Sequence, residues 1–348
     1  MDRSTRDRRV EALVRRCHAG LSAAELGDEV LRRLRGVMTI DAGFFASVDP
    51  STLLFTGVTT EDPLAGATEL FLGNEFGEPD VNKFATLAAA SHPVESLDGA
   101  THNERGISAR YRDVMAPLGL GDELRAAFRV GGTTWGVICL HREDGPTGFD
   151  ADDLAVLDRL GPHIAEGLRR SVLLGGANAT GDVLDEPGVI LLHPDLGIAA
   201  VTPAAERWMD EVADAWPRAG RLPLPVYVVA QRLLMLDKDA FPRVRLRDPA
   251  GRWVTLHASH LSDGSGIAVV VEPARPGDAV STTLAAHGLT NREAEVAQLV
   301  LRGSSTRQIV DELHISAHTV QDHMKAVFAK TGVGSRRELV ATLLGAPR

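Results

Sequence analysis

The segment LHISAHTVQDHMKAVFAKTGVGSRRELV, residues 313–340, decides the fold of the C-terminal part of the chain. Within it, apolar residues recur at the helical spacing i, i+4, i+7, i+8, at Val320, Met324, Val327 and Phe328. The opposite side of the same predicted helix is polar, with His318, Gln321, Asp322 and Lys325. One side of this helix is therefore expected to pack in a core, and the other to face solvent or a ligand.

Capping signals divide the surrounding sequence into four short helices. A capping box pairs a hydroxyl residue with an acidic residue three positions later and satisfies the first amides of a helix. The predicted caps are Thr290 with Glu293, Ser305, Ser316, and Ser335 with Glu338. The tight turn HIS, residues 314–316, joins the second helix to the third, so residues 305–324 are predicted to form a helix-turn-helix. The second helix of such a motif fits the major groove of DNA.

This region resembles the LuxR-type helix-turn-helix family through the pieces LTNREAEV, GSSTRQIVDEL, ISAHTVQDHM and FAKTGVGSRRELV. Together they span nearly all of residues 285–345 without a gap. The resemblance implies a recognition helix at about residues 317–331 and dimerisation through the last helix. The family often places a basic residue where Gln321 stands, but a glutamine can still bind adenine bidentately.

The candidate DNA-binding residues are Ser305, Arg307, His318, Thr319, Gln321, Asp322, Lys325, Lys330 and Arg336. The candidate dimer residues are Leu339, Val340, Leu343 and Leu344. For Lys325 and Lys330 the alternative to a DNA contact is a solvated helix surface. His323 has two open interpretations, a packing residue or a DNA contact. Asp322 can accept a hydrogen bond from cytosine N4, although its carboxylate repels phosphate.

The charge of the chain is unevenly distributed. The whole chain carries a formal net charge of −10, with 37 basic and 47 acidic residues. Residues 281–348 hold eight Lys/Arg and six Asp/Glu, a net charge of +2, so the remainder carries −12. The last segment can therefore approach a polyanion, whereas the remainder repels phosphate and disfavours indiscriminate DNA binding.

Length and composition predict a multidomain globular protein. The 348 residues suffice for two or three domains, and 44% of them are hydrophobic. Cys17 and Cys139 form no C-x-x-C motif, so we expect neither a disulfide framework nor a metal site, and no cofactor is indicated. The sequence contains no signal-peptide pattern and no run of about 18 apolar residues, so we expect a cytoplasmic protein without membrane contact.

Changes of pattern along the chain predict the domain boundaries. Residues 1–36 are expected to form N-terminal helices, 37–172 a first domain, 187–273 a second and 284–348 the DNA-binding domain, with linkers at 173–186 and 274–283. The first domain shows strands at 42–49 and 53–60, a hairpin around Gly131-Gly132, and a helix capped by Asp150 that Pro162 should bend or restart. Residues 61–120 show no clear pattern. In the second domain the order strand-strand-helix-helix-strand-strand-strand is expected, with Thr202-Pro203 opening the first helix.

The first domain resembles a GAF domain, chiefly through FRVGGTTWGVICLHREDGPTGFDADDLAVLDRLGPHIAEGL, and the second resembles a PAS domain through GVILLHPDLGIAAVTPAAERWM. The implied fold class is multidomain α+β: GAF-like and PAS-like antiparallel sheet domains, then an all-α four-helix LuxR-type helix-turn-helix domain. Cavities in such folds bind small molecules in some relatives and are packed cores in others. His92, His102, His141 and His163 are expected to be ordinary surface or hydrogen-bonded histidines, and Cys139, Trp135 and Trp208 to be core residues.

The function predicted from these patterns is transcription regulation by a DNA-binding protein whose GAF/PAS-like half senses a small molecule or a partner. Its expected partners are double-stranded DNA and a second copy of the chain, with RNA polymerase and an unidentified small-molecule effector as further candidates. The alternative is a constitutive DNA-binding regulator, or an interaction scaffold, whose sensor-like domains bind no ligand. The sequence holds no P-loop, no G-x-G-x-x-G after a strand, no H-E-x-x-H and no G-x-S-x-G, so an enzyme is not expected.

Overall fold

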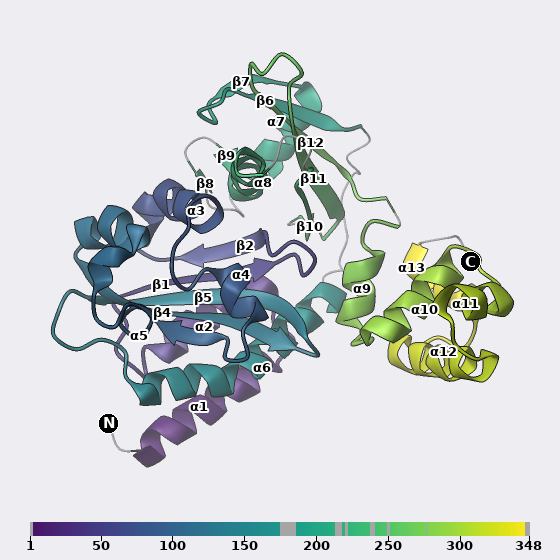
Figure 1. The fold of residues 1–348 in the computed structure, drawn as a ribbon, viewed down its shortest axis with the longest axis horizontal. Helices are drawn as coiled ribbons and strands as arrows, with labels where there is room; N and C mark the ends of the chain where they lie inside the picture. Colours follow the sequence, from purple (N-terminus) through teal and green to yellow (C-terminus); the bar gives the residue numbers. More distant parts are fainter. Residues whose placement is uncertain are drawn as a thin grey trace. The chain divides into compact units, whose positions relative to one another are not determined.

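The computed structural model describes residues 3–174, 186–212, 218–219, 222–236, 241–248, 251–275 and 277–344. The chain forms two compact units, Met1–Pro273 and Ala274–Arg348 (Figure 1). The first unit contains two five-stranded antiparallel sheets, and the second is helical. The predicted α+β class with an all-helical C-terminal domain is confirmed. Among the described residues, no helix has the length and apolar character needed to cross a membrane.

The first sheet has the strand order β2-β1-β5-β4-β3. Its strands are β1 (Ala42–Val48), β2 (Phe55–Thr60), β3 (Val94–Ser96), β4 (Leu120–Val130) and β5 (Thr133–Glu143). The predicted hairpin is confirmed as β4-β5. Gly131 and Gly132 in its turn have φ angles of 60° and 80°, which a residue with a side chain adopts only with strain.

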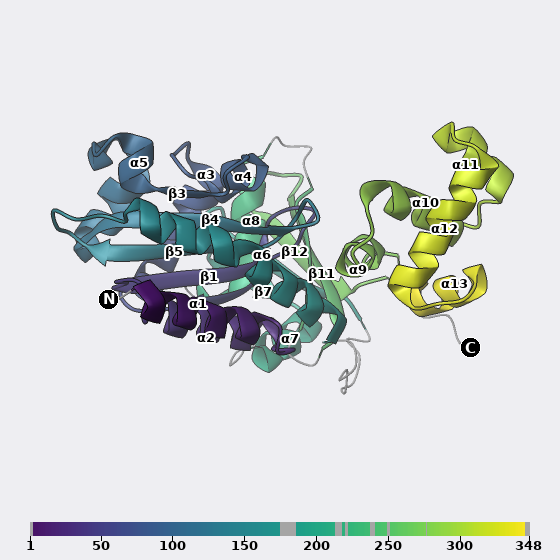
Figure 2. The same cartoon turned by 90° about the horizontal axis from the view of Figure 1, so that it is seen from below.

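Three helices form a layer on one side of this sheet: α1 (Arg3–Cys17), α2 (Ala23–Leu34) and α6 (Ala151–Leu174) (Figure 2). α2 and α6 contact the strands, and α1 packs on both helices. Asp150 caps α6 as predicted, because its Oδ1 accepts a hydrogen bond from the Asp153 amide at 2.9 Å. Pro162 was expected to bend or restart this helix. The restart does not occur, since α6 runs through Pro162, and the bend stays a prediction. Buried Leu160 and Ile164 on either side of the proline keep that surface of the helix against the sheet, which offsets the lost backbone hydrogen bond.

Short elements cover the other face of the first sheet, and they come from the region that showed no clear sequence pattern. They are the 3₁₀ turn Leu64–Ala67, α3 (Thr68–Gly77), α4 (Phe84–Ala89), α5 (Leu97–Thr101) and the turns Arg105–Ile107, Tyr111–Met115 and Ala116–Leu118. Helices of five to ten residues are not stable alone. Their positions therefore depend on contacts with the sheet rather than on local propensity.

The second sheet repeats the strand order of the first, because in each the first strand lies between the second and the fifth. Its order is β10-β11-β12-β6-β7, formed by β6 (Gly188–Leu192), β7 (Ile198–Val201), β10 (Arg243–Arg247), β11 (Trp253–His260) and β12 (Ile267–Pro273). The two helices of this part are α7 (Pro203–Glu211) and α8 (Leu224–Leu234). The predicted element order is confirmed, with Thr202 as the N-cap of α7. A two-residue pair, β8 (Arg218–Ala219) with β9 (Leu222–Pro223), was not apparent from the sequence.

One apolar core spans both sheets. α8 contacts α3 and β2 of the first sheet as well as β11 and β12 of its own. The eight consecutive residues 224–231 are all buried, which is possible only if every side of the helix is covered. The two sheets on either side of the predicted linker at 173–186 therefore share one core and do not form two independent ones. Residues 175–185 of that predicted linker lie outside the described residues. A PAS-like nature of the second sheet stays a prediction.

Asp49 ties the two sheets together through polar contacts. It is buried in the turn after β1, and its Oδ2 accepts hydrogen bonds from the backbone amide of Arg245 on β10 at 3.0 Å and from the Arg245 guanidinium at 3.3 Å. Its Oδ1 accepts from the Ser51 amide at 2.9 Å.

Replacing Asp49 with alanine should lower the free energy of unfolding by about 1–3 kcal/mol, because the amide and the guanidinium of Arg245 lose a buried carboxylate acceptor. Urea denaturation of the full chain measures this cost. Asp195→Ala is the matched control, since Asp195 accepts the Gly197 amide at 3.0 Å in an exposed turn. Equal costs for the two variants would contradict a tie between the sheets.

The second unit consists of α9 (Val280–Ala286), α10 (Asn291–Leu301), α11 (Thr306–Leu313), α12 (Ala317–Thr331) and α13 (Arg336–Leu344). The expected linker at 274–283 ends earlier than the sequence pattern indicated. α9 begins at Val280 because Val280 and Leu284 are buried in the core of this unit. The four predicted helices are confirmed as α10 to α13, and the capping box of Thr290 and Glu293 is present.

Candidate nucleic-acid interface

α11 and α12 form a helix-turn-helix. His314 ends α11 in the left-handed conformation, with φ 52°, and Ser316 then caps α12 by accepting the Thr319 amide at 3.0 Å. Val320 and Val327 are completely buried and Met324 is nearly so, which fixes the rotation of α12 about its axis. The helix predicted at 317–331 is confirmed as α12, and its role as a recognition helix stays a prediction.

The rotation of α12 leaves an exposed strip of four side chains, His318, Gln321, Asp322 and Lys325, called the outer strip below. Asp322 lies between His318 and Lys325. Its carboxylate contacts His318 Nδ1 at 2.8 Å and Lys325 Nζ at 3.3 Å. The hydrogen bond from Lys325 and the nearby His318 lower the pKa of Asp322. Exposed pairs of this kind contribute little to stability, so phosphate or base atoms can replace them on docking.

Four other predicted DNA-binding residues already have partners within the unit. Ser305 caps α11 in a capping box with Gln308, and Thr319 shares a hydrogen bond of 2.9 Å with Ser316. Arg336 donates to the Ser304 carbonyl at 3.3 Å and to Thr306 Oγ1 at 3.0 Å. Lys330 forms an ion pair with Glu293. Arg307, by contrast, is exposed on α11. The DNA roles of all nine residues stay predictions.

Lys330 pairs with Glu293, a contact between residues 37 positions apart that no local pattern indicates. The Nζ to Oε2 distance is 2.6 Å, and the same carboxylate accepts the Thr290 amide at 2.7 Å. Burial raises the pKa of Glu293, but these two hydrogen bonds outweigh it, and the pKa is lowered overall. Lys330 thus joins the end of α12 to the start of α10.

The last helix offers less apolar surface than the sequence suggested. Leu339 is completely buried in the core of its own unit, so it has no surface for a partner. Val340, Leu343 and Leu344 are partly buried. Val340 lines a pocket of about 330 Å³ beside α13, together with Val300, Gly303, Ser304, Arg336, Arg337 and Ala341. A dimer contact through α13 stays a prediction for the three residues with exposed surface.

A buried ionic cluster, Glu75, Asp80, Arg110, Glu123 and Arg125, lies between the first sheet and α3. Arg125 Nη2 donates to Glu75 Oε2 at 2.7 Å, and the Arg110 guanidinium lies 2.7 Å from Glu123 Oε2. Asp80 Oδ2 accepts the Arg110 amide at 2.7 Å. Burial alone would raise the pKa of Glu123, but the nearby Arg110 and Arg125 guanidinium groups and the hydrogen bond from Arg110 lower it overall. The three carboxylates of the cluster face its two guanidinium groups, and the ammonium group of Lys83 is a third cation near Glu75 and Asp80.

His141 departs from its expected role. It was expected to be a surface or hydrogen-bonded histidine, but it is completely buried, and neither ring nitrogen has a hydrogen-bond partner among the described residues. Burial lowers the pKa of His141 to about 4. The alternation of β5 places it on the same face of the sheet as Cys139, beside Glu123 and Arg125 of the neighbouring strand β4. His92 and His102 are exposed and His163 shares a hydrogen bond with His18, as expected.

Cys139 is a core residue as predicted, and so are Trp135 and Trp208. Burial raises the pKa of the Cys139 thiol well above its usual value. No sequence pattern indicated that Cys139 and His141 lie beside Glu123, because that neighbourhood arises from pairing between β4 and β5.

Comparisons with known proteins identify two regions. Residues 287–343 match the family described as bacterial regulatory proteins, luxR family, and residues 22–168 match the GAF domain. The chain is 41% identical over 56 residues to the spore germination protein GerE of Bacillus subtilis (strain 168), which is 16% of this chain and 76% of that protein. It is 43% identical over 53 residues to the monoamine regulon transcriptional regulator of Klebsiella aerogenes, 15% of this chain but only 23% of that protein's length.

Solved structures show a weaker likeness. The GAF domain of a phosphoenolpyruvate-protein phosphotransferase from Coxiella burnetii is 13% identical, with a TM-score of 0.36, over 50% of this chain and 99% of that chain. Escherichia coli SdiA is 13% identical, with a TM-score of 0.35, over 97% of this chain and 96% of that chain. At these TM-scores neither likeness carries an argument.

Proposed function

Because the chain belongs to the luxR family of bacterial regulatory proteins and has an N-terminal GAF domain, we propose that it regulates transcription by binding DNA through α12. The GAF domain and the second sheet then form the input half, which senses a small molecule or a partner. The outer strip carries the proposal, since it is the exposed polar surface of the second helix in a helix-turn-helix.

Each side chain of the outer strip suits one kind of contact. Gln321 can bind adenine with two hydrogen bonds, and Asp322 can accept one from cytosine N4. Lys325 offers a charge to a phosphate, as His318 does when protonated. The acidic first unit supports selective binding to DNA, because the residues outside segment 281–348 carry a net negative charge and repel DNA.

The proposal includes partners and a place of action. Two copies of the chain would bind a roughly two-fold symmetric operator, with half-sites about one helical turn apart. RNA polymerase and a small-molecule effector are further proposed partners, and the cytoplasm is the proposed location. No catalytic role is proposed. The competing function is an interaction scaffold that does not bind DNA.

Footprinting of full-length protein on DNA selected from a random pool tests this proposal. The parent should protect a defined site, and a variant with His318, Gln321 and Lys325 all changed to alanine should not. Arg302→Ala is the control, because Arg302 is an exposed cation at the end of α10 outside the strip. Failure of the parent to protect any DNA would favour the scaffold.

Replacing Lys325 with alanine should weaken binding to all DNA sequences alike and lower the salt slope by about one unit, since one phosphate contact is lost. Titrations over a salt series on operator and random DNA measure this. Lys330→Ala is the matched variant. It should change the slope less and instead lower stability, because Lys330 pairs with Glu293. Equal changes in slope would place Lys330 on the DNA after all.

A further inference from the structure

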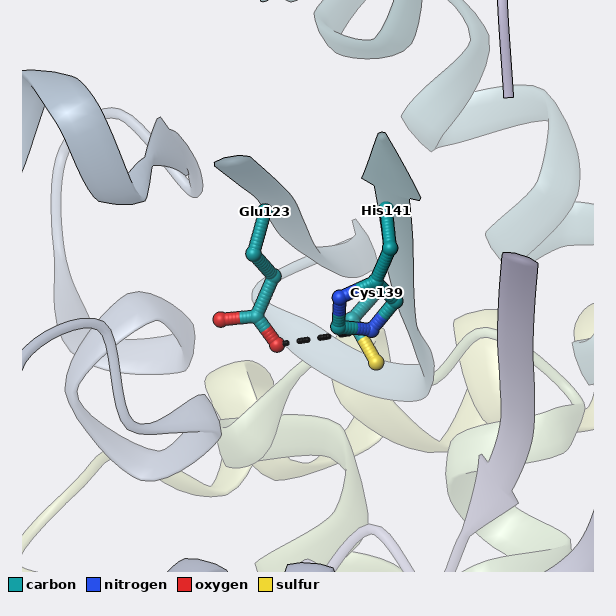
Figure 3. A group of neighbouring side chains, drawn as sticks. All are labelled: Glu123, Cys139 and His141. Carbon is teal, nitrogen blue, oxygen red and sulfur yellow. Dashed lines mark ion pairs between the residues drawn. The ribbon is translucent and has the colours of Figure 1, made fainter. Parts of the chain in front are cut away.

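Three potential metal ligands lie together on one face of the first sheet (Figure 3). Glu123 on β4 stands opposite His141 on β5, and Cys139 precedes His141 by two residues, so all three share that face. A carboxylate oxygen of Glu123, the Cys139 sulfur and a ring nitrogen of His141 all lie within 4.8 Å of one another.

The polar atoms in this group are buried and poorly satisfied. Within the described part of the chain, Glu123 Oε1 and both ring nitrogens of His141 have no hydrogen-bond partner. Oε1 lies 3.8 Å from Nε2 of His141, too far for a hydrogen bond. A buried polar atom without a hydrogen-bond partner destabilises the folded state. Folded proteins seldom tolerate several such atoms in one place, so these atoms point to a shared ligand.

Neighbouring arginines orient this group rather than complete it. Arg110 donates to Glu123 Oε2 through Nε at 2.8 Å, which leaves Oε1 turned toward His141. Arg125 donates through Nη2 to Glu75 and through Nη1 to the Asn82 carbonyl at 3.0 Å, whereas its Nε lies 3.7 Å from Glu123 Oε1, too far for a hydrogen bond. Partners that hold a ligand side chain by its other polar atom are typical of metal sites.

We infer that Glu123, Cys139 and His141 bind a thiophilic metal ion, Zn²⁺ or Cu⁺, inside the GAF domain. Sulfur and imidazole ligands suit these ions, whereas Mg²⁺ and Ca²⁺ prefer oxygen atoms alone. Metal–ligand bonds of about 2.0–2.3 Å place two ligand atoms at most about 4 Å apart around one ion. The three ligand atoms lie within 4.8 Å of one another, so binding would require only small rotations of their side chains.

Two properties of the site bear on the choice between Zn²⁺ and Cu⁺: the net charge around it and the kinds of ligand atom it offers. The carboxylates of Glu75, Asp80 and Glu123 face the cations of Arg110, Arg125 and Lys83. With a Cys139 thiolate, Cu⁺ adds no net charge to this group, whereas Zn²⁺ adds one positive charge. A carboxylate ligand favours Zn²⁺ instead, and Zn²⁺ would keep a fourth position for a donor atom of a small molecule. The site adds to the proposed function and does not depend on DNA binding.

The test uses the full chain stripped of metal by a chelator. Zn²⁺ is titrated against a chromophoric competitor, and Cu⁺ against a copper(I) chelator under anaerobic reducing conditions. The parent should bind one ion per chain, and Cys139→Ala should weaken that binding at least about 10-fold. Cys17→Ala is the matched control, because Cys17 is also a buried thiol, on α1 in the opposite layer. It should bind as the parent does.

Cobalt(II) gives a second measurement. The parent and Cys17→Ala should show thiolate-to-cobalt charge-transfer absorption, and Cys139→Ala should not. If circular dichroism shows that Cys139→Ala does not fold, His141→Gln replaces it and should weaken binding to a similar extent. Stoichiometric binding of neither ion by the parent, or unchanged binding by both variants, would overturn the inference. DNA binding is not part of the measurement, so that result would leave the proposed function intact.

Discussion

Replacing Arg125 with methionine should lower the free energy of unfolding by about 3–5 kcal/mol, because it breaks a buried ion pair by removing one partner. Methionine fills much of the same volume, so the cost is mainly electrostatic. Glu75 Oε2 loses its hydrogen bond of 2.7 Å and stays buried with an uncompensated charge. The Phe84 ring also loses the guanidinium that lies 3.8 Å from its centre. Urea denaturation of the full chain measures the change.

Two further variants isolate the electrostatic cause. Arg129→Met lies on the same strand and removes only hydrogen bonds to the carbonyls of Ala88 and Ser91, at 3.0 and 3.4 Å. It should cost much less than Arg125→Met. Adding Glu75→Gln to Arg125→Met should recover part of the loss, since the remaining partner is then neutral. If Arg129→Met costs as much, the cluster is not what stabilises this face of the sheet.

Replacing Gln321 with alanine should weaken operator binding by about 1–3 kcal/mol, or about 5–150-fold in Kd. The loss should be confined to one base position, because a bidentate contact to adenine distinguishes that base from the others. Binding to random DNA should change little, in contrast to Lys325→Ala. Titrations on the selected operator and on its single-base variants measure the effect.

Gln298→Ala is the control for this experiment, since Gln298 lies on α10, outside the outer strip. It should leave the base preference unchanged. If Gln321→Ala also leaves the preference unchanged at every position, Gln321 does not read a base. If Lys325→Ala then behaves like the parent as well, α12 does not face the groove.

Sequence patterns predicted those parts of the fold that local chemistry determines. The helix α12 was predicted because Ser316 caps it and its apolar residues recur at helical spacing, and the resemblance to the LuxR-type family implied its extent, about 317–331. The β4-β5 hairpin followed from two adjacent glycines, and α7 from Thr202 and Pro203. In each case the residues that set the element are a few positions apart.

Parts that depend on distant residues could not be predicted. The helices of residues 61–118 are short and held by the sheet, and α6 tolerates Pro162 because its buried side packs on β4 and β5. The Lys330–Glu293 pair and the Glu123–His141 neighbourhood join positions 37 and 18 residues apart. Only the folded backbone brings such residues together, so the sequence pointed to the outer strip but not to the potential metal ligands.

The helix α8, enclosed on all sides between the two sheets, also bears on how such a chain can evolve. Recombination could exchange the GAF sheet for one from another regulator. The side chains of α3 and β2 in the exchanged domain would then not fit those of α8. Changes on one side of this helix should therefore require compensating changes on the other, and we expect the two sheets to be inherited together. We then expect the smallest exchangeable module of the first unit to be the whole of Met1–Pro273.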